Sequence, residues 1–153
     1  MYSRARARAL PWGWGCAGAL PWGWGIEMTE KRLWKRVRER MARVRGWHGT
    51  RIEASSGEAM VGTPDAVITA GGRTRWVELK CWPEPLNPHQ RVWCLERDAT
   101  GADGVLVLAV LYYNQIGLMP WEDYDRGHFV RGWHGTMADV PEAFLSKTWR
   151  GIR

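Results

Sequence analysis

The chain of 153 residues predicts an α/β fold in which a small central mixed β-sheet is flanked by helices. Helical periodicity begins at Thr29, and a second helix is expected from Pro88 to about Ala99. Between and after these helices lie short segments rich in β-branched residues, which are typical of strands. The expected order is therefore helix, three strands, helix and strand, and this length favours a single domain.

The first 27 residues differ from the rest of the chain. The heptapeptide ALPWGWG occurs at 9–15 and again at 19–25, without helical or strand periodicity. The pattern changes abruptly at Met28. We therefore expect 1–27 to be either a disordered leader or sequence upstream of a true start at Met28, and 28–153 to form one domain.

The first predicted helix starts with Thr29 as its N-cap. Apolar residues at helical spacing give it one buried stripe, formed by Leu33, Val37, Met41 and Val44. Basic residues dominate its other faces, namely Lys31, Arg32, Lys35, Arg36, Arg38, Arg40, Arg43 and Arg45. Such a surface is either a solvated helix face or a track for phosphate groups. The net charge of +6 and the pI of about 9.7 favour a polyanionic partner.

Three strands are expected before the second helix, at 50–54, 66–70 and 74–80. Gly71 and Gly72 join the last two, because glycine tolerates the positive φ that a tight hairpin turn needs. After the second helix, the apolar run 104–113 predicts a buried central strand. A short helix is expected at 139–147.

Charged groups are expected to meet at one end of the predicted hairpin. Asp65 stands at the entrance of its first strand and Glu78 near the end of its second, so antiparallel pairing makes them neighbours. Side chains alternate along a strand, which places Glu78 and Lys80 on the same face. Two carboxylates and one amine at a single point suit metal-assisted cleavage of a phosphodiester.

Mg²⁺ is the metal that these side chains favour, and Mn²⁺ can take its place. Mg²⁺ prefers oxygen ligands and needs only one or two carboxylates, because waters and phosphate complete its octahedron. Asp65 and Glu78 are the expected ligands, with the backbone carbonyl of Leu79 as a further candidate. Lys80 is expected either to orient or activate the attacking water or to stabilise the pentavalent phosphorus.

These motifs resemble the PD-(D/E)XK nuclease superfamily. Gly62-Thr-Pro-Asp65 is followed, thirteen residues after the Asp, by Glu78-Leu-Lys80, and Gln90 comes ten residues after the Lys. The pattern is most similar to VRR-Nuc-type and Holliday-junction-resolvase-like small nucleases, which phages often carry, over roughly Thr29 to Val110. The resemblance implies a restriction-endonuclease-like core. It also implies a Mg²⁺-dependent endonuclease that hydrolyses DNA to 5′-phosphate and 3′-hydroxyl ends.

The resemblance implies further site residues. An acidic residue on the first helix is typical of these families, and Glu30 matches it, with Glu53 as a second candidate. Gln90 matches the helix glutamine that positions Lys80 or the DNA backbone, although Gln in a first helical turn also serves as a capping partner. Junction resolvases act as dimers because two strands must be cut symmetrically, so a homodimer is a candidate assembly.

Cysteine spacing and hydropathy indicate the location of the protein. Cys16, Cys81 and Cys94 are odd in number and lack paired spacing, which argues against a disulfide framework. No run of about twenty apolar residues exists to cross a membrane. Both observations favour the cytoplasm, and the resemblance makes this a bacterial or phage-infected cell.

Two other function classes stay open. One is a non-catalytic nucleic-acid-binding protein on a nuclease-like scaffold. The other is a nuclease-like subunit whose surface, in a chain with 12 tryptophans, binds a protein partner. An assay for metal-dependent cleavage distinguishes an enzyme from both of these alternatives.

Overall fold

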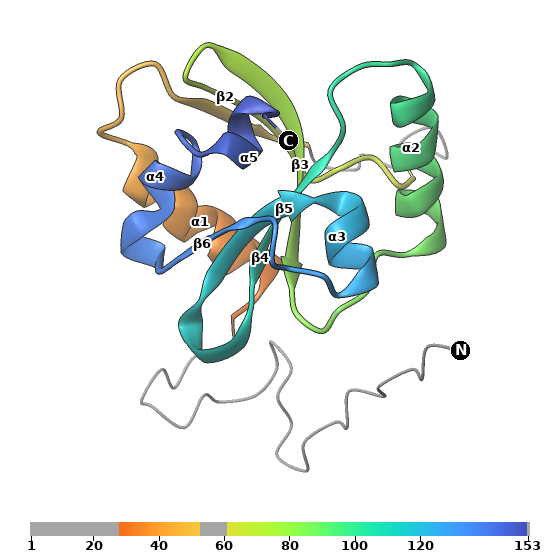
Figure 1. The fold of residues 1–153 in the computed structure, drawn as a ribbon. Coiled ribbons are helices and arrows are strands. Elements are labelled where there is room, and N and C mark those ends of the chain that lie inside the picture. Colours follow the sequence, from red (N-terminus) through yellow and green to blue (C-terminus); the bar gives the residue numbers. More distant parts are fainter. Residues whose placement is uncertain (1–27, 53–60, 153) are drawn as a thin grey trace.

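The computed structural model describes residues 28–52 and 61–152, which form one six-stranded sheet with helices on both faces (Figure 1). The strands lie across the sheet in chain order: β1 (His48–Arg51), β2 (Ala66–Ala70), β3 (Arg73–Cys81), β4 (Leu106–Val110), β5 (Ile116–Pro120) and β6 (Trp133–Gly135). Neighbouring strands are antiparallel except β3 and β4, which are parallel and joined through helix α2 (Pro88–Ala99). The predicted α/β class with a small mixed sheet is confirmed.

The hairpin of β2 and β3 forms where it was predicted. Gly71 and Gly72 have φ values of 56° and 77°, which a two-residue type I′ turn requires and which side-chain-bearing residues rarely adopt. The register places Ala66 opposite Val77, so β3 runs on past the start of β2. Among the described strands, its residues 78–81 then pair with β4 alone, which leaves one edge of β3 open.

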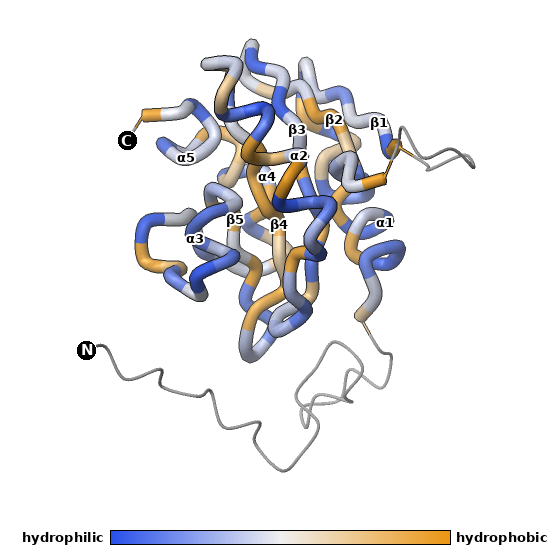
Figure 2. The backbone as a smooth tube through the Cα atoms, turned by 90° about the vertical axis from the view of Figure 1, so that its right-hand side faces the viewer, coloured by the Kyte–Doolittle hydropathy of each residue, from blue (hydrophilic) through white to orange (hydrophobic). Residues whose placement is uncertain are grey.

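Helices cover both faces of this sheet (Figure 1). On one face lie the helices α1 (Glu30–Met41), α4 (Val140–Ala143) and α5 (Lys147–Arg150); on the other lie α2 and α3 (Trp121–Arg126). Alternate residues of β4 therefore enter different apolar layers, and Figure 2 shows apolar colour gathered along the central strands. Thr29 caps α1 as predicted, because its hydroxyl accepts a hydrogen bond from the Arg32 N–H at 3.2 Å.

Two predicted strand boundaries are wrong. The first strand is His48–Arg51, whereas it was predicted at 50–54. Residues 53 and 54 of the predicted strand lie outside the described part of the chain. The run 104–113 is not one strand, because β4 ends at Val110 and the 3₁₀ turn η2 (Tyr112–Asn114) reverses the chain into β5. This turn holds two non-glycine residues at positive φ and contains neither Gly nor Pro, so the sequence pattern does not reveal it.

The C-terminal region is more folded than predicted. Strands β5 and β6 extend the sheet, although one terminal helix was the only element expected there. That helix, predicted at 139–147, is divided into the 3₁₀ turn η3 (Met137–Asp139), α4 and α5. The division arises because Ser146 caps α5, its side chain accepting from the Trp149 N–H, instead of continuing α4.

Two of the three cysteines lie in the described part of the chain, and both are buried. Cys94 is a free thiol in α2, and Cys81 ends β3. Separately, none of the helices in 28–52 and 61–152 combines the length and apolar character needed to cross a bilayer.

The end of the chain closes the core over the α1 face. Trp149 of α5 is 1 % exposed and packs edge-on against Phe144, with ring centroids 4.8 Å apart. Its indole N–H donates to the carbonyl of Ala70 at 2.9 Å. Nearby, the buried guanidinium of Arg75 donates to the carbonyls of Trp149 and Gly104 at 3.0 and 3.1 Å. The last helix thus completes the core instead of lying loosely on it.

Replacing Trp149 with alanine should lower the free energy of unfolding by about 3–5 kcal/mol, because the change removes a buried aromatic ring and leaves a cavity. Urea denaturation monitored by circular dichroism measures this loss. Leu145→Ala is the matched control, since Leu145 precedes the same helix but is 60 % exposed, and should cost less than about 0.5 kcal/mol. Similar losses for both variants would contradict the assignment of Trp149 to the core.

Candidate active site

The candidate site lies at the open edge of β3. Here β3 continues past the residue at which its pairing with β2 begins. The N–H of Leu79 in this part of β3 donates to Asp65 Oδ2 at 2.9 Å instead of to a carbonyl of β2. The N–H and C=O of one strand residue face the same edge of the strand. The Leu79 carbonyl is therefore directed toward the edge where Asp65 lies. This geometry places the Asp65 carboxylate and the Leu79 carbonyl side by side.

Lys80 sits at the centre of a cluster of carboxylates and is only 4 % exposed. Its Nζ lies 3.3 Å from Glu78 Oε1, 3.5 Å from Glu30 Oε1 and 3.6 Å from Glu84 Oε1. An ammonium has three N–H donors, and three carboxylates surround this one. Glu30 reaches the cluster because it begins α1, whose N-terminus lies beside the end of β3.

Gln90 makes the capping contact that the sequence allowed, and its other side-chain contact is with Glu78 rather than with Lys80. Its Nε2 donates to Glu78 Oε1, and its Oε1 accepts the Asn87 N–H at 2.9 Å. Asn87 Oδ1 in turn accepts the Gln90 N–H at 2.8 Å, which completes a capping box at the start of α2. The cap therefore fixes the side chain that holds Glu78 in place.

The carboxylates of the site outnumber its cation. Burial raises the pKa of Glu78 to about 8; the nearby charge of Asp65 adds to this rise, and Lys80 partly offsets it. Burial and Asp65 likewise raise the pKa of Glu30. Burial alone would lower the pKa of Lys80, but the negative charges of Glu78, Glu30 and Glu84 outweigh it and the net shift is upward. Lys80 is therefore an ammonium at neutral pH, surrounded by carboxyl groups.

The donor set at this edge suits a small divalent cation. Across 28–52 and 61–152, no group of three or more His, Cys, Asp or Glu side chains is arranged to hold a metal by itself. Mg²⁺ does not require such a group, because one or two carboxylates with waters and a substrate phosphate suffice. Asp65, Glu78 and the Leu79 carbonyl are all hard oxygen donors, and a cation would offset their excess charge. The residues present thus fit Mg²⁺ or Mn²⁺.

The structure places most of the predicted residues together. Hydrogen bonds and ion pairs link Asp65 to Leu79, and Glu78 to Lys80 and Gln90. Glu30 joins them through Lys80, whereas Glu53 lies outside the described residues. The cluster also contains a residue that the sequence did not suggest.

That residue is Glu84, in the Pro-rich connection after β3. It follows Lys80 by four positions, but no helical or strand periodicity there indicates that it turns back. The backbone turns because the Glu84 N–H donates to the Cys81 carbonyl at 2.8 Å. The only signal available in the sequence was a further acid close to the Glu-x-Lys motif.

Comparisons with known proteins bear on the fold. The sequence matches no protein-family profile, and no curated protein matches it. A similar solved structure is that of Hjc from Archaeoglobus fulgidus, a Holliday junction resolvase from an archaeal hyperthermophile. The match has a TM-score of 0.51 and 18% sequence identity, and covers 72% of this chain and 98% of that chain. The chain therefore has the α/β fold of a resolvase of this kind.

Proposed function

We propose that this protein is a metal-dependent endonuclease that hydrolyses phosphodiester bonds in DNA. The observation that carries the proposal is the convergence of Asp65, Glu78 and Lys80 at the open edge of β3. The fold shared with a Holliday junction resolvase supports the proposal, because a cluster of carboxylates and a lysine in the fold of a nuclease suits phosphodiester hydrolysis. Four-way junctions are the substrate that this likeness favours, and flaps are a second candidate.

Each group has a role that follows from its chemistry. Asp65, Glu78 and the Leu79 carbonyl would hold Mg²⁺, which supplies charge neutralisation and polarises the phosphoryl oxygen. Gln90 keeps Glu78 oriented. Lys80, held as an ammonium, donates hydrogen bonds to the attacking water or to the oxygens of the pentavalent phosphorus, where negative charge develops. A cation of this kind orients and stabilises; it does not remove a proton.

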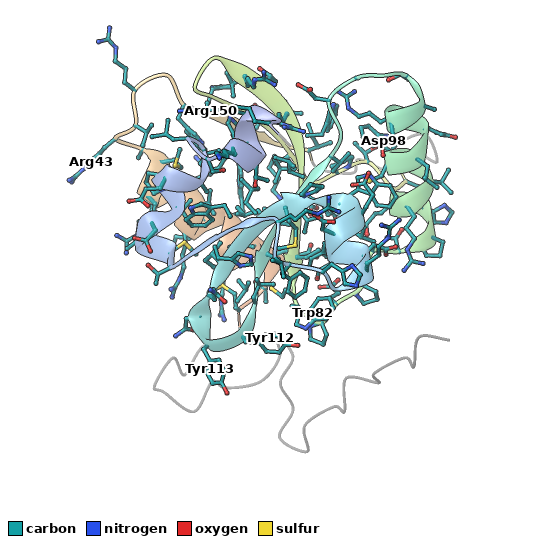
Figure 3. The ribbon with its side chains drawn as sticks, in the orientation of Figure 1. Arg43, Trp82, Asp98, Tyr112, Tyr113 and Arg150 are labelled. Atoms are coloured by element: carbon teal, nitrogen blue, oxygen red, sulfur yellow. The ribbon has the colours of Figure 1, made fainter. Side chains whose placement is uncertain are left out.

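The basic face of α1 offers a binding surface for DNA phosphates. Glu30, at the start of this helix, contacts Lys80, and basic side chains follow along the solvent face. Among them Lys31, Lys35 and Arg38 are exposed, and Arg43 just beyond the helix points away from the body of the protein (Figure 3). A strand whose phosphates follow α1 would therefore bring one phosphodiester to the site.

Replacing both Lys31 and Lys35 with alanine should weaken DNA binding and reduce its salt dependence. Each lost phosphate contact lowers the slope of log affinity against log salt by about 0.9. Fluorescence anisotropy over a range of salt concentrations measures this slope. The matched double variant Arg126→Ala with Arg131→Ala removes equal charge on the α3 side of the sheet. Equal changes in slope for the two pairs would refute the proposed path along α1.

Cleavage assays on labelled DNA test the proposed function directly. Four-way junction, flap, duplex and single-stranded substrates are incubated with Mg²⁺ or with EDTA, beside Lys80→Ala. Mg²⁺-dependent cleavage that is lost in the variant supports the endonuclease, and paired symmetric cuts in a junction support a homodimer. Binding without cleavage of any substrate would favour the non-catalytic nucleic-acid-binding alternative.

A further inference from the structure

The contact between Lys80 and Glu84 adds a residue to the site. Glu84 Oε1 lies 3.6 Å from Lys80 Nζ, although the side chain of Glu84 is 51 % exposed and that of Lys80 is 4 % exposed. Glu78 on the same ammonium is almost completely buried. Glu30 on the same ammonium is 29 % exposed, so Glu84 is the most exposed of the three carboxylates and faces the solvent from which DNA approaches.

Two hydrogen bonds fix the backbone of Glu84. Its carbonyl accepts the Tyr124 hydroxyl at 2.6 Å, and its N–H donates to the Cys81 carbonyl at 2.8 Å. Tyr124 is fully buried in α3 and packs edge-on against Trp82, with ring centroids 5.5 Å apart. Trp82 in turn donates its indole N–H to the Tyr112 hydroxyl at 2.7 Å, and these two residues lie together in Figure 3. Buried contacts thus fix the backbone that carries this half-exposed carboxylate.

Glu78 and Glu84 have different roles beside Lys80. Glu78 is also bound by Gln90 and belongs to the proposed metal ligands at the β3 edge. Glu84 lies outside that edge, on the connection from β3 to α2, and the ion pair with Lys80 is the contact that the structure gives its carboxylate. A carboxylate with that placement can hold the ammonium while Glu78 serves a metal.

We propose that Glu84 is a positioning residue that holds the Lys80 ammonium toward the incoming phosphate. The inference rests on the endonuclease function proposed above, and concerns the orientation of Lys80 within that site. Loss of this anchor lets the ammonium move relative to the reacting group, and such misplacement slows chemistry. Removal of a negative charge from the solvent side of the site also removes a repulsion against DNA. Loss of the anchor therefore lowers the rate of cleavage, whereas loss of the repulsion raises the affinity for DNA.

Three variants separate these consequences in steady-state cleavage assays at saturating DNA and in DNA-binding assays. Glu84→Gln is expected to lower kcat by about 10- to 100-fold and to tighten the Kd for DNA by about two- to five-fold at low salt. Glu84→Asp keeps the charge but shortens the side chain, so it should lower kcat without changing Kd. Glu39→Gln, an exposed acid near the other end of α1, should tighten Kd and leave kcat unchanged.

The outcomes distinguish this inference from the proposed function. A kcat within two-fold of wild type in both Glu84 variants would overturn the positioning role and leave the endonuclease intact. A fall in kcat accompanied by weaker DNA binding and a lower Tm would also overturn it, because that pattern marks a structural role. Absence of metal-dependent cleavage by the wild-type protein would instead overturn the proposed function, on which the inference rests.

Discussion

Replacing Lys80 with alanine is expected to lower the rate of metal-dependent DNA cleavage by about 10²- to 10³-fold or more. The expected loss is this large because a preorganised donor in a buried site stabilises developing charge far better than water does. The structure fixes the donor firmly: Nζ lies within 3.6 Å of the carboxylates of Glu30, Glu78 and Glu84. Single-turnover cleavage of a labelled substrate measures the effect.

The fold and most of the DNA affinity should survive this substitution. Burial raises the pKa of Glu78 to about 8 even with Lys80 beside it, so this carboxyl can hold a proton at neutral pH and is not left as an unpaired buried charge when the ammonium is gone. The basic face of α1 still binds phosphates. Lys35→Ala, an exposed lysine on that face, is the matched control, and should weaken binding without slowing cleavage at saturating DNA. Full activity of Lys80→Ala would refute the role assigned to Lys80.

The part of the site that the sequence predicted depends on local rules. Gly71 and Gly72 determine the turn, the turn determines the register of β2 and β3, and the register makes Asp65 a neighbour of Leu79. The cap at Asn87 and Pro88 likewise fixes the start of α2 and so the position of Gln90. None of these steps needs information from a distant part of the chain.

The parts that could not be predicted depend on tertiary contacts. Glu84 is held in place by Tyr124, forty residues later, and no local pattern signals that hydrogen bond. Strands β5 and β6 depend on the reversal at Tyr113 and Asn114, whose positive φ values are maintained without glycine. The placement of Glu30 beside Lys80 also depends on the packing of α1.

Asp65→Asn is expected to abolish the stabilisation by Mg²⁺ and to lower cleavage by about 10²- to 10³-fold or more, as expected for loss of a group that stabilises developing charge. The substitution removes the negative charge proposed to bind the metal. It keeps an oxygen that can accept the Leu79 N–H, which Asp65 Oδ2 now accepts at 2.9 Å. A ligand that binds only the native state raises its stability, so Tm with and without Mg²⁺ reports binding independently of cleavage.

Comparison with Asp65→Ala separates the two duties of this carboxylate. Alanine removes the metal ligand and also leaves the Leu79 N–H without its acceptor, which should cost a further 1–3 kcal/mol or so of unfolding free energy. Both variants should therefore be inactive and insensitive to Mg²⁺, while only Asp65→Ala has a markedly lower Tm in EDTA. If Asp65→Asn kept both cleavage and a rise of Tm with Mg²⁺, Asp65 would serve only to close the edge of β3. The metal would then have to be held by other oxygens of the site.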